Sequence, residues 1–393
     1  MAKGYSAEEG GMQSYARGVA EAYADAGAEV TVFTQTAKGP RRMKVGPVML
    51  IDVGRPKSPL MPFLLRWAMR GEGAEHGLPD LVHGTTWRTS VLPMMMGLPY
   101  VTTFHGREFM YGGKGIVGLM RLVARRAASI AAVSGYSAGR LRERLGDDIP
   151  QPVIAWNGLG DSTEHGAAHA APNDPPLIFS LCRMEPRKNI AACVEVLAQL
   201  RDRGHAFRYI IGGRGPALER IQQLVRQNGL EDRVEAAGFM PADRVAQLYA
   251  QADIFLHPQI EIDDGRDFEG FGIAIADAMV CETAVILGKA GGAIELIQPG
   301  VNGLAVDGTD PTELREALDR LLSNPEERRA MARSARLHAE ATFRWDRHIA
   351  LILASAGWRE SAAEIDRQPA PSPGFFGRFR ARRHEPGFVR PVE

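Results

Sequence analysis

The chain has 393 residues, a length that suggests about two domains. Its 47 basic and 47 acidic side chains give a formal net charge of zero, so no overall field favours nucleic acid or an anionic surface as partner. Hydrophobic content is 45%, as in ordinary globular proteins, and no apolar run approaches the roughly 18 residues of a membrane span.

Short apolar runs alternate with longer helical patterns in the first half of the chain. We predict helices over 13–26 and 118–128. Strands are predicted over 30–33, 48–53, 80–83, 100–104, 129–133 and 152–155. Strands separated by helices imply a parallel sheet with helices on both faces. A polar stretch rich in Gly, Ala, His and Pro over 158–176 then indicates a linker.

The same pattern restarts after the linker. Strands are predicted over 177–182, 208–211, 234–237, 253–257 and 284–287, and helical regions over 190–200, 311–340 and 345–360. Two doubly wound α/β domains that face each other account for this order, and a ligand would sit in the cleft at the carboxyl ends of the strands. We place the domains at 1–165 and 166–345, a helix that crosses back to the N-terminal domain at 346–362, and a disordered basic tail at 363–393.

The first strand of the N-terminal domain is missing from the predicted pattern. Only residues 1–8, which are small and polar, precede the glycine-bearing loop that begins at Glu9. A parallel sheet without a central strand would leave unpaired backbone groups on both sides of the gap. We therefore expect residues 1–3 to be the tail of a longer first strand that begins upstream. A compromised domain is the other interpretation.

The cysteines and the N-terminus bear on the cellular compartment. Cys182, Cys193 and Cys281 lack metal or redox spacing and lie in apolar runs, which predicts buried free thiols in a reducing environment. Residues 1–4 show no charged-then-apolar signal pattern. We expect a cytoplasmic location.

The segment 267–277 carries the strongest chemical signal. It places two carboxylates, Glu269 and Asp277, around a glycine-flanked Phe271 at the start of an apolar helix. The amides of Gly272 and Ile273 would point out of the helix N-terminus and could receive a phosphate oxygen. The carboxylates could accept hydrogen bonds from sugar hydroxyls. The pattern predicts a site for a polyhydroxylated, phosphorylated ligand.

Two cations follow the first strand of the second domain. Arg183 and Lys188 lie five residues apart, at the carboxyl end of a strand and before a helix. Arginine offers a flat fork to phosphate oxygens and lysine a point charge, so the pair suits a diphosphate. A solvated basic turn is the alternative.

Other loops at strand ends give weaker signals. Gly213 follows a strand within a glycine-rich turn, where the backbone could approach a ligand closely, and a tight turn is the alternative. His105 ends a strand and would face the cleft, or it is structural. Gly11 opens a helix and could lie against a phosphate, or it only starts the helix.

Several known catalytic patterns are absent from the sequence. There is no phosphate-binding G-x-x-x-x-G-K-[ST] loop, no H-E-x-x-H and no D-x-D pair to hold a metal on a diphosphate. The full fingerprint of a nicotinamide cofactor is a G-x-G-x-x-G loop directly after a strand, with an acid about 20 residues later. The G-x-G-x-x-G spacing at 113–118 has neither the strand nor the acid, so this fingerprint is not supported. No metal and no cofactor are expected.

The ordered set of motifs resembles the retaining GT-B glycosyltransferases, in the large family with bacterial mannosyltransferases, sucrose synthases and many cell-envelope sugar transferases. The resemblance covers residues 9 to 345 and is strongest from 177 to 303. Each motif alone is weak, and their order is specific. The motifs are Arg183…Lys188, Glu269-Gly270-Phe271-Gly272, Gly291-Gly292-Ala293-Ile294-Glu295, Gly300-Val301-Asn302-Gly303 and, in the N-terminal half, Gly10-Gly11, His105-Gly106 and Trp156-Asn157-Gly158.

The resemblance implies a retaining, metal-independent hexosyltransferase that uses a nucleotide-diphosphate sugar and a hydroxyl acceptor, such as a cell-envelope glycan or glycolipid. Arg183 and Lys188 would bind the diphosphate, while Glu269 and His105 would contact the donor sugar. Donor-binding roles fall to Gly11, Gly213, Phe271, Gly272, Ile273 and, at the ribose, Asp277. Glu108 and Asn157 are placed on the acceptor side.

The chain departs from the family pattern in three places. The second carboxylate is Asp277 instead of glutamate, the residues 278–282 lack a glycine at the helix end, and the first strand is absent. These departures motivate an alternative, a non-catalytic sugar-nucleotide-binding or partner protein on a degenerate GT-B scaffold.

Two segments mix basic and apolar residues and could lie on anionic lipid, where a lipid-linked acceptor would reside. They are 116–126 and 375–383. A core-packing helix is the alternative for the first, and a solvated tail for the second. We expect peripheral contact with the inner face of the membrane.

Overall fold

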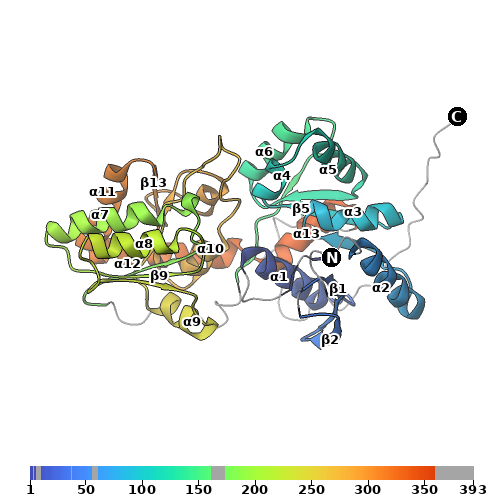
Figure 1. Cartoon of the computed structure of the whole chain (residues 1–393), viewed down its shortest axis with the longest axis horizontal. Helices are drawn as coiled ribbons and strands as arrows, with labels where there is room; N and C mark the ends of the chain where they lie inside the picture. The colour runs from blue at the N-terminus through green and yellow to red at the C-terminus, as the bar shows by residue number, and fades with distance from the viewer. Residues whose placement is uncertain (3, 6–9, 37, 55–60, 161–172, 359–393) are drawn as a thin grey trace.

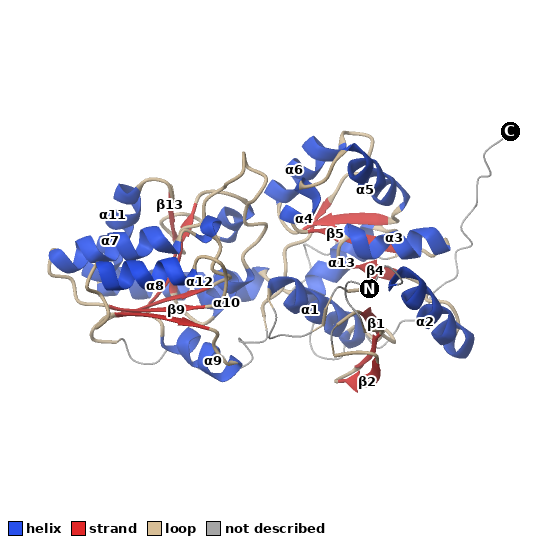
Figure 2. Cartoon of the chain, viewed as in Figure 1, coloured by secondary structure: helices blue, strands red, loops and turns tan. Residues whose placement is uncertain are grey.

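The computed structural model describes residues 1–2, 4–5, 10–36, 38–54, 61–160 and 173–358. The chain forms two α/β domains, with the N-terminal domain on the right of Figure 1 and the C-terminal domain on the left. Figure 2 shows that in each domain the strands lie between helices. The predicted fold class, two Rossmann-like domains with parallel sheets, is confirmed.

The N-terminal domain carries two short sheets, ordered β1-β3-β2 and β4-β5-β6-β7. All pairings are parallel except that of β2 with β3. Its elements are α1 (Gly11–Asp25), β1 (Thr31–Thr34), β2 (Arg41–Val45), β3 (Val48–Asp52), α2 (Met61–His76), β4 (Val82–Gly84), α3 (Trp87–Met96), β5 (Tyr100–Phe104), α4 (Arg107–Met110), α5 (Lys114–Arg126), β6 (Ser129–Ala132), α6 (Gly135–Leu145) and β7 (Val153–Ile154).

The first two residues of the chain lie between these two sheets. The amide of Ala2 donates to the carbonyl of Phe33 at 3.0 Å, on the β1 side. On the β4 side, the nitrogen of Met1 donates to the carbonyl of His83 at 2.6 Å, and the Met1 carbonyl accepts from Thr85 at 3.0 Å. No strand is assigned to the described residues here, yet both sheets use the backbone of residues 1 and 2.

The C-terminal domain is built on one parallel six-stranded sheet, ordered β10-β9-β8-β11-β12-β13. Its elements are β8 (Leu177–Leu181), the 3-10 helix η3 (Pro186–Lys188), α7 (Ile190–Asp202), β9 (Arg208–Gly212), α8 (Leu218–Gln227), β10 (Val234–Gly238), α9 (Ala242–Gln251), β11 (Ile254–His257), α10 (Ile273–Val280), β12 (Ala284–Gly288), the 3-10 helix η4 (Gly292–Leu296), β13 (Leu304–Val306), α11 (Pro311–Ser323) and α12 (Pro325–Thr342).

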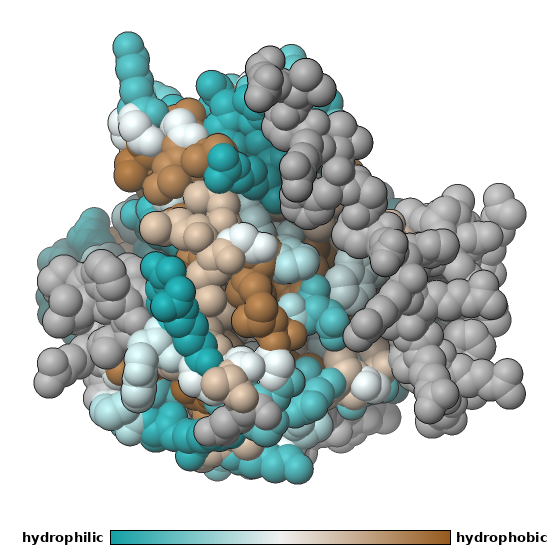
Figure 3. All heavy atoms as spheres, turned by 90° about the vertical axis from the view of Figure 1, so that its right-hand side faces the viewer, coloured by the Kyte–Doolittle hydropathy of each residue, from teal (hydrophilic) through white to brown (hydrophobic). Residues whose placement is uncertain are grey.

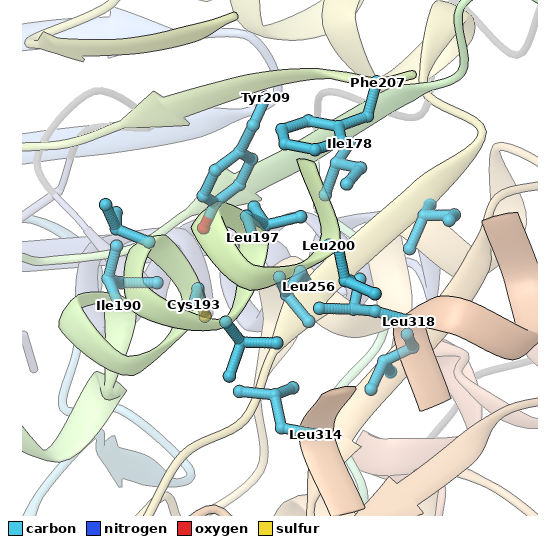
Figure 4. Packing of buried hydrophobic residues seen from close by; sticks show 14 of the residues in the cluster. Ile178, Ile190, Cys193, Leu197, Leu200, Phe207, Tyr209, Leu256, Leu314 and Leu318 are labelled. Atoms are coloured by element: carbon cyan, nitrogen blue, oxygen red, sulfur yellow. The ribbon is translucent and has the colours of Figure 1, made fainter. Parts of the chain in front are cut away.

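The core of the C-terminal domain explains why helix α7 forms where it does. Ile190, Val194, Leu197 and Leu200 recur at helical spacing, and all four are buried against the sheet and α11 (Figure 4). Strand β8 is buried on both faces, as expected for a central strand of a parallel sheet.

The last described helix, α13 (Trp345–Ser355), packs on the N-terminal domain. Ile349 joins Tyr15 and Val19 of α1 in one buried cluster, and Ile352 packs with Ala131 of β6. Figure 1 shows this orange helix among the elements of the N-terminal domain. The chain therefore returns to its first domain after completing the second.

Some elements differ from the sequence expectation. Strand β2 was not predicted, because its residues Arg41–Val45 are charged and mostly exposed on a sheet edge. The helical region predicted over 311–340 divides into α11 and α12, since Pro325 lacks the amide that would continue a helix and Asn324 has a non-helical conformation. The predicted tail and most of the linker lie outside the described residues.

Cys193 and Cys281 are buried free thiols as predicted, and Cys182 is partly buried. Within the described ranges, no helix is both long enough and apolar enough to span a bilayer.

Candidate functional site

The candidate site lies where the two central strands of the C-terminal sheet end. Strands β8 and β11 are hydrogen-bonded neighbours, and Ile254 is in register with Ile178. The loop after β8 leads into η3 with Lys188, and the loop after β11 carries Glu269. Because the carboxyl ends of parallel strands meet at one edge, these two loops converge.

The carboxylate of Glu269 is the centre of this convergence. Nη1 of Arg187 lies 2.7 Å from its Oε2, and Nζ of Lys188 donates to the same oxygen. Nε2 of His257, at the end of β11, lies 3.4 Å from Oε2 and 3.2 Å from Nζ of Lys188. The sequence-predicted Lys188 and Glu269 are thus in direct contact.

These contacts decide the charge states in the site. Burial opposes ionisation of Glu269, but Lys188 and Arg187 hold its pKa well below the usual range. Burial, reinforced by Lys188, lowers the pKa of His257 to about 4. At neutral pH the carboxylate is therefore charged and the imidazole is neutral.

The two predicted diphosphate cations lie in different surroundings. The side chain of Arg183 is 72% exposed and its Nη2 is 3.4 Å from Glu185, whereas that of Lys188 is 9% exposed. Arg187, with a side chain 14% exposed, is the arginine that joins Lys188 at Glu269. Arg183 is left at the surface, where its contact is with Glu185 and not with Glu269.

The start of α10 provides backbone donors beside this cluster. Gly272 is the N-cap of α10, with φ of 95°, a conformation that favours glycine. Within the part of the chain that the structure describes, the amides of Gly272 and Ile273 have no hydrogen-bond partner. The side chain of Phe271 instead packs in the C-terminal core against Phe343, so only its backbone is available to a donor.

Asp277 lies one turn into α10 and is buried. Its Oδ1 accepts the amide of Gly160 at 2.7 Å, at the end of the N-terminal domain. A Cβ at Gly160 would lie only 2.7 Å from the Asp277 carboxylate, so the two groups are in close contact. The carboxylate expected at the ribose thus also holds the connection between the domains.

His105 follows β5 and is partly buried. Its Nε2 donates to the carbonyl of Thr85 at 2.8 Å, and its ring stands edge-on to Tyr15 of α1 with centroids 4.5 Å apart. The amide of His105 donates to Oε1 of Glu108 at 2.6 Å. Glu108, expected on the acceptor side, therefore fixes the turn that carries His105.

The two glycines expected near the donor have different surroundings. Gly11 begins α1, and a Cβ there would meet nothing within 4 Å. Gly213 has φ of 125°, and a Cβ there would lie 1.8 Å from the Cys182 carbonyl. The backbone of Gly213 thus packs closely against the loop after β8. This supports the interpretation of Gly213 as part of a tight turn instead of a donor contact.

The domain connection contains a buried amide and an unpredicted carboxylate. Among the described residues, Oδ1 of Asn157 is buried without a hydrogen-bond partner. Glu295 of η4 accepts the amides of Gly135 and Tyr136 at 2.8 and 2.7 Å, and Nε1 of Trp156 at 3.2 Å. A C-terminal-domain side chain thus caps helix α6 of the N-terminal domain.

Sequence reasoning missed Arg187, His257 and Glu295 as site residues. All three stand in stretches that were already singled out: Arg187 next to Lys188, His257 at the end of a predicted strand, and Glu295 in a quoted motif. Strand-end position was a usable signal for His257. The contact of Glu295 with α6 had no sequence signal, because it depends on how the domains meet.

Two family models match the chain, one per domain. Residues 9–158 match "Glycosyltransferase Family 4", and residues 161–338 match "Glycosyl transferases group 1". The chain is 33% identical to a GDP-mannose-dependent alpha-(1-6)-phosphatidylinositol monomannoside mannosyltransferase of Mycolicibacterium smegmatis. The match extends over 259 residues and covers 62% of this chain and 66% of that relative. It is 26% identical to D-inositol 3-phosphate glycosyltransferase of Acidothermus cellulolyticus, over 91% of this chain and 87% of that protein.

Solved structures share the fold over both domains. Sucrose-phosphate synthase from Thermosynechococcus elongatus superposes with a TM-score of 0.72 at 22% identity, covering 88% of this chain and 92% of that one. HepE from Anabaena, solved with UDP and glucose, superposes with a TM-score of 0.68 at 20% identity, covering 90% of this chain and 100% of that one.

Proposed function

The chain belongs to the GT-B glycosyltransferases, and from this premise we propose that it moves a hexosyl group from a nucleotide-diphosphate sugar to a hydroxyl acceptor with retention of anomeric configuration. The observation that carries the proposal is the Glu269 carboxylate held by Lys188 and Arg187, three residues before the amides of Gly272 and Ile273, which have no hydrogen-bond partner among the described residues. Cations and amides suit a diphosphate, and a carboxylate suits sugar hydroxyls.

To bind, the donor would replace contacts that the site residues now make with one another. Its diphosphate competes with Glu269 for Lys188, and Arg183 turns in from the surface. Glu269, freed from one of its two cations, accepts hydrogen bonds from the sugar. Because the pKa of Glu269 is held low, it acts as an ionised acceptor.

The transfer step follows from these roles. The bond between the anomeric carbon and the phosphate oxygen breaks while the acceptor oxygen bonds to the same face of that carbon. The acceptor proton passes to the leaving phosphate oxygen. The negative charge of the diphosphate is met by Lys188, Arg183 and the α10 amides, which lowers the barrier by stabilising the leaving group. The proposal needs no metal, in keeping with a sequence that has no D-x-D pair.

The relatives suggest where to begin with substrates. One is named as GDP-mannose-dependent and acts on a phosphatidylinositol mannoside, so GDP-mannose is the first donor to test. UDP-glucose comes second, because HepE was solved with UDP and glucose. We propose a cell-envelope glycan, glycolipid or other glycoconjugate as acceptor.

The test is release of nucleoside diphosphate from these donors, with and without glycolipid acceptors. Lys188→Ala and Glu269→Ala should each lower the rate by about 10- to 100-fold, the value of a hydrogen bond between charged groups. Lys44→Ala, an exposed lysine on β2, is the matched control and should keep the wild-type rate. Equal rates in all four proteins would refute the assigned roles.

A second candidate, a non-catalytic sugar-nucleotide-binding protein, is favoured by one observation. The Asp277 carboxylate is buried and bound to the Gly160 amide. Calorimetry with GDP and UDP separates the two candidates. Binding without turnover of any donor, in a protein extended upstream of Met1, would support the second candidate over the first.

We also propose that the enzyme is cytoplasmic and contacts the inner face of the membrane through α5. Ile116 and Leu122 are each 40% exposed, and Lys114, Arg125 and Arg126 are exposed on the same helix. Figure 3 shows apolar residues among hydrophilic ones on the face of this domain that is turned away from the C-terminal domain. Ile116→Glu with Leu122→Glu should abolish co-sedimentation with anionic vesicles, and unchanged co-sedimentation would refute the contact.

A further inference from the structure

Residues 267–270, here called the docking segment, belong to the C-terminal domain but pack on the N-terminal one. They follow β11 and lead to α10. The ring of Phe268 is 2% exposed and sits in the core of the N-terminal domain, with centroids 5.0 Å from Tyr136 and 6.3 Å from Phe109. A large apolar side chain is thus buried in the opposite domain, directly before Glu269.

Two glycines allow this close contact. A Cβ at Gly106 would lie 3.1 Å from the Phe268 ring, and Gly106 has φ of 147°. A Cβ at Gly270 would lie 1.8 Å from the carbonyl of His105. The docking segment is therefore in van der Waals contact with the turn that carries His105, at a distance that only glycine permits at both positions.

Ion pairs hold the same segment from both sides. Asp267 lies 3.1 Å from Nε of Arg187 in the C-terminal domain and 3.6 Å from Nη1 of Arg107 in the N-terminal domain. Arg107 is also 3.6 Å from Glu185. The charge network around Glu269 thus continues across the domain boundary.

The loop that precedes the docking segment also meets the N-terminal domain. The hydroxyl of Tyr111 donates to Oδ2 of Asp263 at 2.6 Å. Nη2 of Arg140 donates to the carbonyl of Gly265 at 3.0 Å. These polar contacts are exposed or partly exposed, so the buried Phe268 is the apolar anchor of the whole loop.

We propose that Phe268 is a positioning residue: its docking in the N-terminal domain sets where the Glu269 carboxylate stands in the donor site. Glu269 has Phe268 on one side and the clamped Gly270 on the other, so its backbone cannot move without undocking the ring. The sugar-binding carboxylate is then correctly placed only when the domains are together. This inference rests on the proposed function of Glu269.

The kinetic test uses the full chain with Phe268→Ala and Phe268→Leu. Misplacing a sugar contact should lower kcat by about 10- to 100-fold in the alanine variant, with leucine between it and wild type. Inhibition constants for GDP and UDP should stay unchanged, because Lys188 and the α10 amides all belong to the C-terminal domain. A merely structural defect would not separate kcat from nucleotide affinity in this way.

Phe207→Leu is the matched control. Phe207 is as buried as Phe268 but lies within the C-terminal core, next to Tyr209 and Ile178 (Figure 4). It should lose thermal stability while keeping kcat. An unchanged kcat in Phe268→Ala, or an equal loss in Phe207→Leu, would overturn the proposal.

Small-angle X-ray scattering of the nucleotide-free protein tests the docking without any activity. Phe268→Ala should increase the radius of gyration because the domains separate more often, and Phe207→Leu should not. An unchanged radius in Phe268→Ala would overturn the proposal even if transfer is observed. If no donor is turned over by the wild type, the proposed function fails, and the scattering result still decides whether Phe268 holds the domains together.

Discussion

Nη1 of Arg187 lies 2.7 Å from Oε2 of Glu269, although 82 residues separate them in the chain. The pair joins the loops after β8 and β11 and is largely buried. Both residues are ionised, since Glu269 and its neighbours raise the pKa of Arg187 against the effect of burial. An ion pair in this position should contribute more than one at the surface.

Replacing Arg187 should therefore be costly. Arg187→Met should lower the unfolding free energy by about 2 kcal/mol, because Glu269 keeps only one cation in a buried site. Arg320→Met is the control: its pair with Glu327 is exposed, and the loss should be below about 1 kcal/mol. Urea unfolding followed by circular dichroism measures both. Equal losses would contradict a special role for Arg187.

Acid should destabilise the protein through His348. Burial lowers the pKa of His348 to about 4, while its ring bridges the Tyr15 hydroxyl and the Trp156 carbonyl. The unfolded chain then binds more protons between about pH 4 and 6.5, so stability falls as the pH drops through that window. From pH 7 to 5 this one residue should remove about 2 kcal/mol.

The matching variant is His348→Gln, which keeps a donor and an acceptor but does not titrate. Its unfolding free energy should depend less on pH between 7 and 5 than that of the wild type. His76→Gln, at an exposed histidine, should leave the slope as it is. Parallel pH profiles for His348→Gln and wild type would show that other groups set the acid sensitivity.

Glu295 should stabilise the chain more than an ordinary helix cap. Its carboxylate accepts two amides of α6 and the Trp156 indole, whereas Asp310 caps α11 within its own domain. Glu295→Ala should cost about 2 kcal/mol and Asp310→Ala about 1 kcal/mol. Only the first should also increase the radius of gyration in solution. A larger loss from Asp310→Ala would argue against the cap between domains.

Gly213 should not tolerate a side chain. Its φ of 125° is unfavourable for other residues, and a Cβ would lie 1.8 Å from the Cys182 carbonyl. Gly213→Ala should lower the melting temperature sharply. Gly46→Ala is the control. Gly46 also has a positive φ, but a Cβ there would meet nothing within 4 Å, so we expect this variant to lose only the about 1 to 2 kcal/mol that backbone strain costs. Similar melting temperatures for the two variants would refute the packing argument.

Local pattern was enough for much of the fold and part of the site. Buried strands such as β8 and β11 are largely apolar runs, and the buried residues of α7 recur at helical spacing. These strands and this helix could therefore be recognised without knowing any tertiary contact. Lys188 was recognisable because it follows the end of a predicted strand, and Glu269 because an acid stands at the start of an apolar helix. Strand β2 could not be recognised, because an exposed edge strand needs no apolar pattern.

The sequence by itself determined two α/β domains, the succession of strands along the chain and two of the charged groups at the carboxyl edge of the second sheet, Lys188 and Glu269. Periodicity and strand-end position are local properties, so the chain displays them directly. Only the tertiary structure decided that Arg187 and not Arg183 binds Glu269, that Asp277 holds Gly160, and that Phe268 lies in the opposite domain. These contacts depend on how far each side chain reaches and on how the domains pack together, and the spacing of residues along the chain determines neither.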